Sequence, residues 1–163
     1  MATRVIRFSL DSASVGRAIN EVKQFKADYI KAIEELMKRL TEEGYNQARF
    51  QIVQMDAVYT GQLVGGILGY YSPALHTGFV LTNVPYAFYV EYGTGVVGAA
   101  NPHPLGGVYD VNHHGDAGWV YLNDRDGRYH WTRGMASRPF MYNTYVHLQR
   151  VTKEIANEVF GSL

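Results

Sequence analysis

The feature that most constrains the fold is a long run of apolar residues, spaced three and four apart, near the start of the chain. This spacing predicts one face of a long amphipathic helix. Its members are Val15, Ala18, Ile19, Val22, Phe25, Tyr29, Ile30, Ile33, Leu36, Met37 and Leu40. Ser12 or Ser14 suits the N-cap of this helix, and Gly44 suits its C-terminal stop. We therefore expect a helix from about residue 12 to residue 44.

Two short apolar runs farther along predict a β-hairpin. Residues 63–71 and 79–82 are rich in aliphatic and aromatic side chains, and residues 72–78 join them. Three glycines in the first run indicate bulges or the close approach of another backbone. Residues 49–58, just before this hairpin, fit either a strand or a continuation of the helix.

The region at about 94–137 is predicted to hold a long loop and an inserted hairpin. Residues 94–116 are rich in Gly, Pro, His and Asn, which indicates a loop. Loops of that length are uncommon in a compact domain and are usually functional or mobile. Residues 118–131 hold aromatic strands around Asp126-Gly127, and Asp-Gly is a strong turn signal.

A second amphipathic helix is predicted at the C-terminal end, with Pro139 in its first turn and Gly161 at its end. Its apolar face consists of Met141, Tyr145, Leu148, Val151, Ile155 and Val159. Between the hairpins, residues 84–93 fit one or two helical turns. This order indicates an α+β fold, with an antiparallel β-sheet and the long N-terminal and C-terminal helices packed on one face. The 163 residues suit a single domain, 1–163.

The composition narrows the classes of function. Lys plus Arg and Asp plus Glu both number 15, so the formal net charge is zero. A protein that grips nucleic-acid phosphates usually carries a basic surplus. The absence of cysteine excludes disulfides, zinc–cysteine sites and a cysteine nucleophile. No apolar run approaches the length of a membrane span, and the first ten residues lack the apolar core of a signal peptide. We therefore expect a soluble protein made in a cytoplasm, with no membrane partner.

The strongest indication of metal chemistry is a group of histidines, His103, His113 and His114, with Asp110 and Asp116 nearby. Imidazole and carboxylate ligands suit zinc and other transition metals. However, the spacing matches no helix-borne zinc motif, and the residues fall in a Gly/Pro-rich stretch. Solvated loop histidines are the preferred interpretation, so neither a metal nor a cofactor is expected. A metal-dependent hydrolase that uses these three histidines is the competing hypothesis of another class.

The second hairpin has an aromatic character of its own, from Trp119, Tyr121, Tyr129 and Trp131. Such a set can stack on bases or sugars, and a carbohydrate-binding module is therefore a third hypothesis. The preferred interpretation is that these rings pack within the hairpin or are buried against another subunit, because aromatic residues are favoured in strands generally.

Three segments resemble a known family. They are Tyr59-Thr60-Gly61-Gln62-Leu63, then Pro85-Tyr86-Ala87-Phe88-Tyr89-Val90-Glu91-Tyr92-Gly93-Thr94, then Arg138-Pro139-Phe140-Met141. In this order, between a charged amphipathic helix and a C-terminal one, they are similar to the neck, or head–tail joining, family of long-tailed bacteriophages. The second segment is the most specific, and the resemblance covers nearly the whole chain. Family members often have a shorter polar loop where this chain has residues 95–137.

The resemblance implies a structural virion protein and not an enzyme. Copies of the chain would form a homo-oligomeric ring in the phage neck after assembly in the host cytoplasm. The ring would contact the head-side connector or head completion protein on one face, and the tail terminator or tail tube protein on the other. DNA would pass through its lumen without sequence-specific binding. A tail terminator or another minor tail protein is the alternative within this class.

The second segment also supplies most of the candidates for a subunit interface. Its aromatic residues are spaced to place rings on both sides of a short helix, and aromatic residues concentrate in interface cores. Glu91 is expected to be an inter-subunit or helix-capping partner for an arginine, with Arg138 as a candidate. A solvated carboxylate is the alternative. The interface candidates are Tyr86, Tyr89, Glu91, Tyr92, Thr94, Arg138, Phe140, Trp119 and Trp131.

Overall fold

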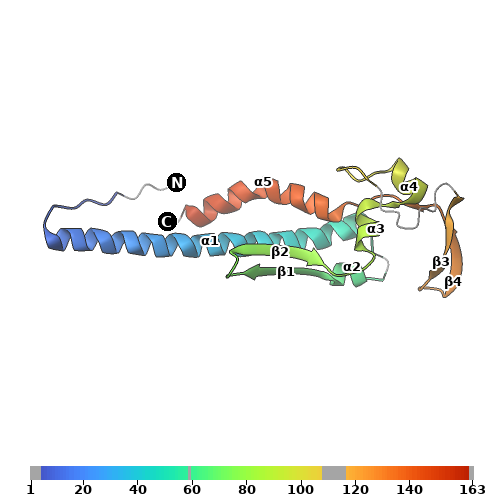
Figure 1. Ribbon diagram of the computed structural model, residues 1–163, viewed down its shortest axis with the longest axis horizontal. Helices are drawn as coiled ribbons and strands as arrows, with labels where there is room; N and C mark the ends of the chain where they lie inside the picture. Colours follow the sequence, from blue (N-terminus) through green and yellow to red (C-terminus); the bar gives the residue numbers. More distant parts are fainter. Residues whose placement is uncertain (1–4, 59, 108–116, 162–163) are drawn as a thin grey trace.

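The computed structural model describes residues 5–58, 60–107 and 117–161. Its elements are α1 (Ser12–Gln54), α2 (Gln62–Gly65), β1 (Ile67–Ser72), β2 (Thr77–Thr82), α3 (Ala87–Tyr92), α4 (Gly95–Ala100), β3 (Trp119–Asn123), β4 (Arg128–Thr132), β5 (Gly134–Met135) and α5 (Phe140–Phe160). The molecule is elongated, because α1 runs along most of its length and α5 lies beside it (Figure 1). The α+β class is confirmed, with the C-terminal helix packed against the long N-terminal one.

The long helix begins at a different cap from the two serines expected. Asp11 is the N-cap, and its carboxylate accepts a hydrogen bond from the Ser14 N–H at 2.8 Å. The pKa of Asp11 is lowered from its ordinary value of 3.8, first by a hydrogen bond from the Ser9 hydroxyl and then by the Ser14 N–H. The helix continues for 43 residues, or about 65 Å. Residues 49–54 are therefore helical, and the predicted stop at Gly44 is wrong.

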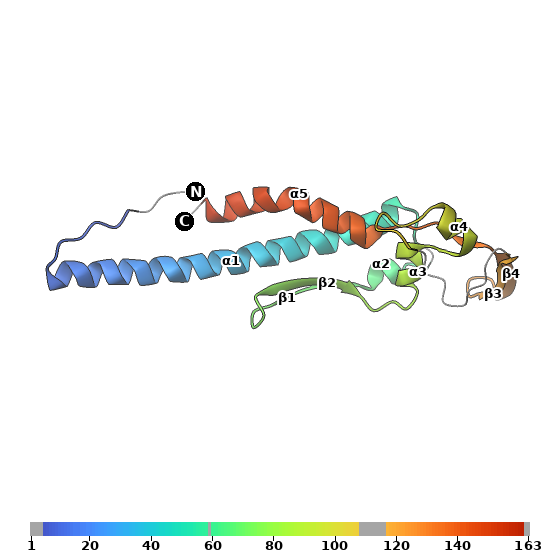
Figure 2. The ribbon, with the colours of Figure 1, turned by 45° about the horizontal axis from the view of Figure 1, so that its top comes forward.

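Gly44 is instead the position where three elements meet. A Cβ at this residue would lie 3.0 Å from Cγ2 of Val80 in β2 and 3.1 Å from Cδ1 of Leu148 in α5. A glycine inside a helix costs about 1 kcal/mol relative to alanine. The missing side chain lets the β1–β2 hairpin and α5 both approach α1, which offsets that cost. In Figures 1 and 2 the two elements flank α1.

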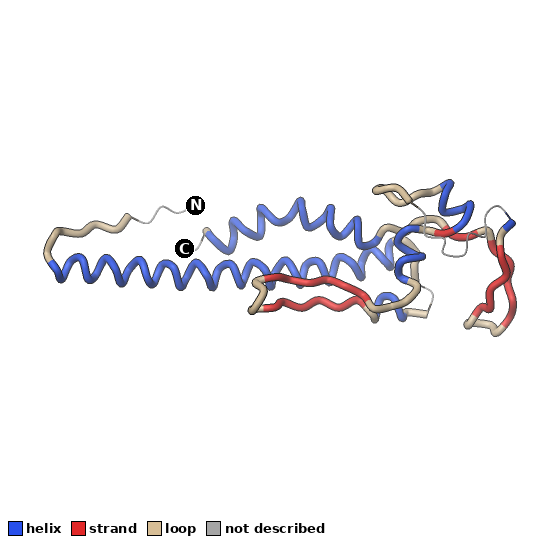
Figure 3. Tube along the Cα trace, viewed as in Figure 1, coloured by secondary structure: helices blue, strands red, loops and turns tan. Residues whose placement is uncertain are grey.

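The strands form two separate antiparallel pairs rather than one sheet within the described residues (Figure 3). In the first hairpin, β1–β2, Ile67 is paired with Thr82 and Ser72 with Thr77, and this hairpin lies along α1. The second hairpin, β3–β4, lies at the far end of the molecule (Figure 1). The region expected to be a loop contains α4, whose first residue, Gly95, bridges with Thr94 to β5.

The main core lies where the end of α1 meets α3 and the start of α5, between the first half of α1 and the β3–β4 hairpin (Figure 1). Its buried residues are Ala48, Ile52, Ala57, Leu63, Ile67, Val84, Ala87, Val90 and Phe140. The first half of α1 contributes none of them. Among the described residues, no helix combines the length and hydropathy needed to cross a bilayer. The core therefore fixes α3 against the start of α5, and the candidate site lies there.

Candidate functional site

Glu91, in the last turn of α3, is the central residue of the site. It is 8% exposed. Its Oε2 accepts from the N–H of Met141 at 2.9 Å, and its Oε1 accepts from the N–H of Tyr142 at 2.9 Å. These N–H groups belong to the first turn of α5, where the helix leaves donors free and its dipole favours negative charge. Pro139, the N-cap residue, provides no side-chain hydrogen bond. Glu91 therefore caps α5 from a distant part of the sequence.

His103 is the third partner of this carboxylate. Its side chain is 1% exposed, and its Nε2 lies 3.1 Å from Oε1 of Glu91. The N–H of Leu105 donates to Nδ1 at 3.1 Å. Because a ring nitrogen that accepts a hydrogen bond carries no proton, the geometry assigns a neutral imidazole that donates its Nε2 proton to Glu91. The rings of Tyr92 and Tyr142 enclose it, with centroids at 4.5 and 5.3 Å.

This environment changes the interpretation of the histidine group. His103 is not the solvated loop histidine that was preferred from the sequence, since it is buried. Both of its nitrogens are engaged in hydrogen bonds, so it has no free lone pair for a metal in this conformation. The other members, His113, His114, Asp110 and Asp116, lie outside the described residues. In the ranges that the structure describes, no three side chains are grouped as metal ligands.

The backbone around Glu91 is fastened to the segment before α5. The hydroxyl of Ser137 donates to the carbonyl of Glu91 at 2.6 Å. The N–H of Arg138 donates to the carbonyl of Val90 at 2.8 Å. Arg138 thus lies beside α3 through its main chain, while the Glu91 carboxylate is bound by His103 and the α5 N-terminus. The expected arginine partner is replaced by these donors.

The segment after Glu91 continues into a close backbone pairing with β5. Thr94 bridges to Met135 and Gly95 to Gly134, and the N–H of Met135 donates to Oγ1 of Thr94 at 3.2 Å. Gly134 has φ +104°, and a Cβ there would collide with the carbonyl oxygen of Thr94 at 1.9 Å. Glycine is required here because it permits this φ and leaves room for the second backbone. The pairing gives the Glu91 segment a structural role inside the chain.

The structure separates the nine interface candidates by exposure. Glu91, Thr94 and Phe140 are buried inside the chain, so they offer no surface to a neighbour. The half-buried candidates are Tyr86, Tyr89, Tyr92, Arg138 and Trp119. Trp131 remains 61% exposed. Phe88 was not a candidate, yet it is 60% exposed and stacks on Tyr92 with ring centroids 6.4 Å apart. Its position one turn before Tyr92 on α3 is the signal that could have identified it.

The β3–β4 hairpin carries an exposed apolar face. Val120 pairs with Trp131 and Leu122 pairs with Tyr129. Alternation along a strand places these four side chains on the same face. Their exposed fractions are 60%, 61%, 51% and 77%. A lone two-stranded hairpin is marginally stable in water. This four-residue set, named here the hairpin face, is therefore a candidate interaction surface.

The first half of α1 carries a second exposed apolar surface. Ile19, Val22, Phe25 and Tyr29 have exposed fractions of 49%, 54%, 38% and 44%. These residues belong to the stripe that predicted the helix, and α5 covers that stripe only from Tyr29 onward, where Phe160 contacts Tyr29. We name the part that α5 does not cover, Val15 to Phe25, the α1 stripe; Val15 and Ala18 in it are half-buried, and residues 5–11 run along this half of α1 in Figures 1 and 2. The sequence located this apolar face but did not indicate that half of it would remain exposed.

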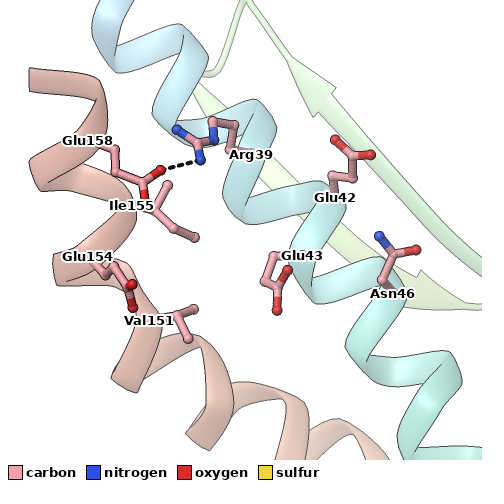
Figure 4. A pocket seen from close by; sticks show the side chains of 8 residues that line it. All are labelled: Arg39, Glu42, Glu43, Asn46, Val151, Glu154, Ile155 and Glu158. Carbon is pink, nitrogen blue, oxygen red and sulfur yellow. Dashed lines mark hydrogen bonds and ion pairs between the residues drawn. The ribbon is translucent and has the colours of Figure 1, made fainter. Parts of the chain in front are cut away.

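An open groove of about 380 Å³ lies between α1 and α5 (Figure 4). Its lining residues are Arg39, Glu42, Glu43, Asn46, Val151, Glu154, Ile155 and Glu158. Arg39 pairs with Glu158 at 2.6 Å, and Glu43 pairs with His147 at 2.6 Å, so both pairs fasten α5 to α1. Exposed pairs of this kind contribute about 0–1 kcal/mol each. No buried side-chain polar atom of the described ranges lacks a hydrogen-bond partner.

Comparison of the chain with known protein families, with curated proteins and with solved structures finds no match. The two exposed apolar surfaces and the buried Glu91–His103 pair are therefore interpreted from their own geometry. The pair connects three parts of the chain by hydrogen bonds: α3, the segment that follows α4, and the first turn of α5. The two exposed apolar surfaces are the candidate interaction surfaces of the described chain.

Proposed function

We propose that this chain is a structural protein of the neck of a long-tailed phage, in which identical copies form a ring between head and tail. The observation that carries the proposal is the incomplete burial of apolar surface in a single copy. The α1 stripe and the hairpin face both hold exposed apolar side chains, while the main cluster of buried residues lies around the end of α1. Contiguous exposed apolar patches mark interaction sites in soluble proteins. A subunit that completes its apolar contacts with neighbours fits this pattern.

The hydrogen bonds and backbone bridges inside the chain are compatible with a ring subunit of this kind. Glu91 and His103 tie α3 and the segment after α4 to the first turn of α5. The bridges at Thr94 and Gly95 tie the same region to β5, which follows the β3–β4 hairpin. The hairpin is thus followed by a strand that is paired with the Glu91 segment, while the side chains of the hairpin face are exposed. Contacts between two different patches of identical copies generate a ring when the rotation closes.

The identity of the ring as a phage neck is supported by the three motifs in the sequence. In this proposal one face of the ring contacts the head-side connector, and the other contacts the tail terminator or the tail tube. DNA passes through the lumen without sequence readout, and the zero formal net charge is compatible with weak phosphate binding. A tail terminator is the alternative in the same class, and the layers that the ring contacts distinguish the two.

Purified virus particles provide the test. An antibody against this chain, or a peptide tag on it, should label the junction of head and tail in electron micrographs. Deletion of the gene should leave filled heads and separate tails, and restoring the gene should rejoin them. Complete particles that lack the protein would refute the proposal. Labelling one layer lower, at the end of the tail tube, would favour the tail terminator.

A further inference from the structure

The α1 stripe follows a heptad pattern that continues beneath α5. Positions Val15, Ala18, Val22, Phe25, Tyr29, Ala32 and Leu36 alternate at spacings of three and four, as the a and d sites of a coiled coil do. Ala32 is buried, and Tyr29 contacts Phe160 at the end of α5 with ring centroids 5.4 Å apart. The part of α1 before Tyr29 extends about 25 Å farther. The same seam is thus covered by α5 in one half and has no covering helix in the other, where Val22 and Phe25 are 54% and 38% exposed and Val15 and Ala18 are half-buried.

The charges beside the exposed part of the seam indicate which helix covers it. With Val15 and Val22 at a sites, Glu21 and Asp28 fall at g sites, and Lys26 falls at an e site. In parallel helices a g residue faces the e residue five positions later on the neighbour. Glu21 would then face the neighbour's Lys26, which is an attractive pair.

An antiparallel arrangement of the same helices pairs g sites with g sites and e sites with e sites. The g sites of the segment are Ser14, Glu21 and Asp28, so in the two registers that overlap most of the segment Glu21 would face Glu21 or Asp28 of the neighbour, and Lys26 would face Ile19 or another lysine. Like charges placed opposite one another destabilise a helix pair. The charge pattern therefore favours a parallel neighbour with the same sequence over an antiparallel one.

We propose that residues 12–28 of α1 pack in parallel and in register against the same segment of a neighbouring copy. Glu21 of each copy pairs with Lys26 of the next, and the side chains of the α1 stripe fill the seam. The inference rests on the proposed ring and names one of its subunit contacts. Parallel, in-register helices are compatible with cyclic symmetry, because every copy presents its g side to the e side of the next.

Disulfide cross-linking tests the contact directly, since the chain has no cysteine. Single variants Glu21→Cys and Lys26→Cys are oxidised separately and as a mixture. The proposal predicts cross-linked dimers in the mixture and only background levels in either variant alone. Cross-linking of Glu21→Cys with itself would indicate antiparallel helices and overturn the proposal. Asn20→Cys, at the f site on the outer side of α1, is the control for random collisions.

A charge exchange provides the second test. Glu21→Lys alone or Lys26→Glu alone should weaken self-association by about two- to tenfold in sedimentation at low salt. The double variant should restore it. Circular dichroism checks that each variant keeps its helix content, so that loss of folding is not mistaken for loss of contact. Equal association by all four proteins would overturn the proposed pairing.

The outcomes separate this inference from the proposed function. Rings in electron micrographs without cross-linking between positions 21 and 26 would refute the helix contact and leave the neck proposal standing. A monomer at every concentration, with no cross-link in the mixture, would also refute the helix contact. In that case labelling of the head–tail junction still decides the function. Cross-linking in a protein that is absent from particles would support the contact and refute the neck proposal.

Discussion

The buried carboxylate of Glu91 can be tested with the substitution Glu91→Gln, which keeps the size of the side chain and removes its charge. One oxygen remains and can still accept two of the three donors, from Tyr142 and His103. The new amide nitrogen then faces the N–H of Met141, which lies 2.9 Å from the present oxygen. Two donors would meet inside the protein.

The expected loss of stability follows from that geometry. A hydrogen bond to a charged group contributes about 1.5–3 kcal/mol, and a buried donor left without a partner costs about 1–3 kcal/mol. Loss of the negative charge at the α5 N-terminus removes about 0.3–1 kcal/mol more. Since these contributions overlap, we expect the free energy of unfolding to fall by about 2–4 kcal/mol.

Urea denaturation followed by circular dichroism, at one fixed protein concentration, measures this loss. Glu43→Gln is the matched control, because Glu43 also pairs with a histidine but its side chain is 40% exposed. Its expected cost is about 0–1 kcal/mol. If the two variants lose the same small amount, the cap on α5 does not contribute as argued, and the reasoning is refuted.

Three further predictions concern other parts of the chain. Gly44→Val should lower stability by about 1–3 kcal/mol in urea denaturation, because its side chain would separate the packed elements. Gly16→Ala is the control, because an added Cβ at this helical site has no atom within 4 Å, and it should raise the free energy of unfolding by about 1 kcal/mol. A loss of equal size in both variants would contradict the packing role of Gly44. Nitrogen-15 NMR at neutral pH should find the proton of His103 on Nε2, and a proton on Nδ1 would exclude the assigned hydrogen bonds. Asp126 has its pKa lowered from 3.8, first by the Arg128 N–H and then by His130, so its contribution to the β3–β4 turn is present above pH 3.8 and is lost as the pH falls through the lowered value. Carboxyl carbon-13 titration should show a midpoint below 3.8 that rises in His130→Ala, and an unshifted midpoint in the parent protein would contradict the contact.

The elements with strong local patterns were predicted well from the sequence. The spacing of apolar residues located most of α1 and all of α5, because a helix repeats its face every three or four residues wherever it packs. The Asp126-Gly127 turn located β3–β4, and Pro85 with Gly93 located the short helix α3. These signals depend on backbone preferences within a few residues of one another, so no knowledge of distant contacts was needed.

The errors arose where distant parts of the chain meet. Gly44 has the local properties of a helix stop, yet it lies inside α1 because Val80 and Leu148 approach it from other elements. His103 lies in a Gly/Pro-rich stretch that favours an exposed loop, yet it is buried against Glu91, 12 residues earlier in the chain. Neither environment is encoded by neighbouring residues.

The sequence by itself determined which faces of the chain are apolar and where its long helices and tight turns lie. Only the tertiary structure decided which of those faces are covered. It buried Glu91 at the first turn of α5, 50 residues away, and left the apolar face of α1 before Tyr29 without a covering helix. The physical reason is that periodicity records the chemistry of each face separately, whereas burial depends on which two faces meet.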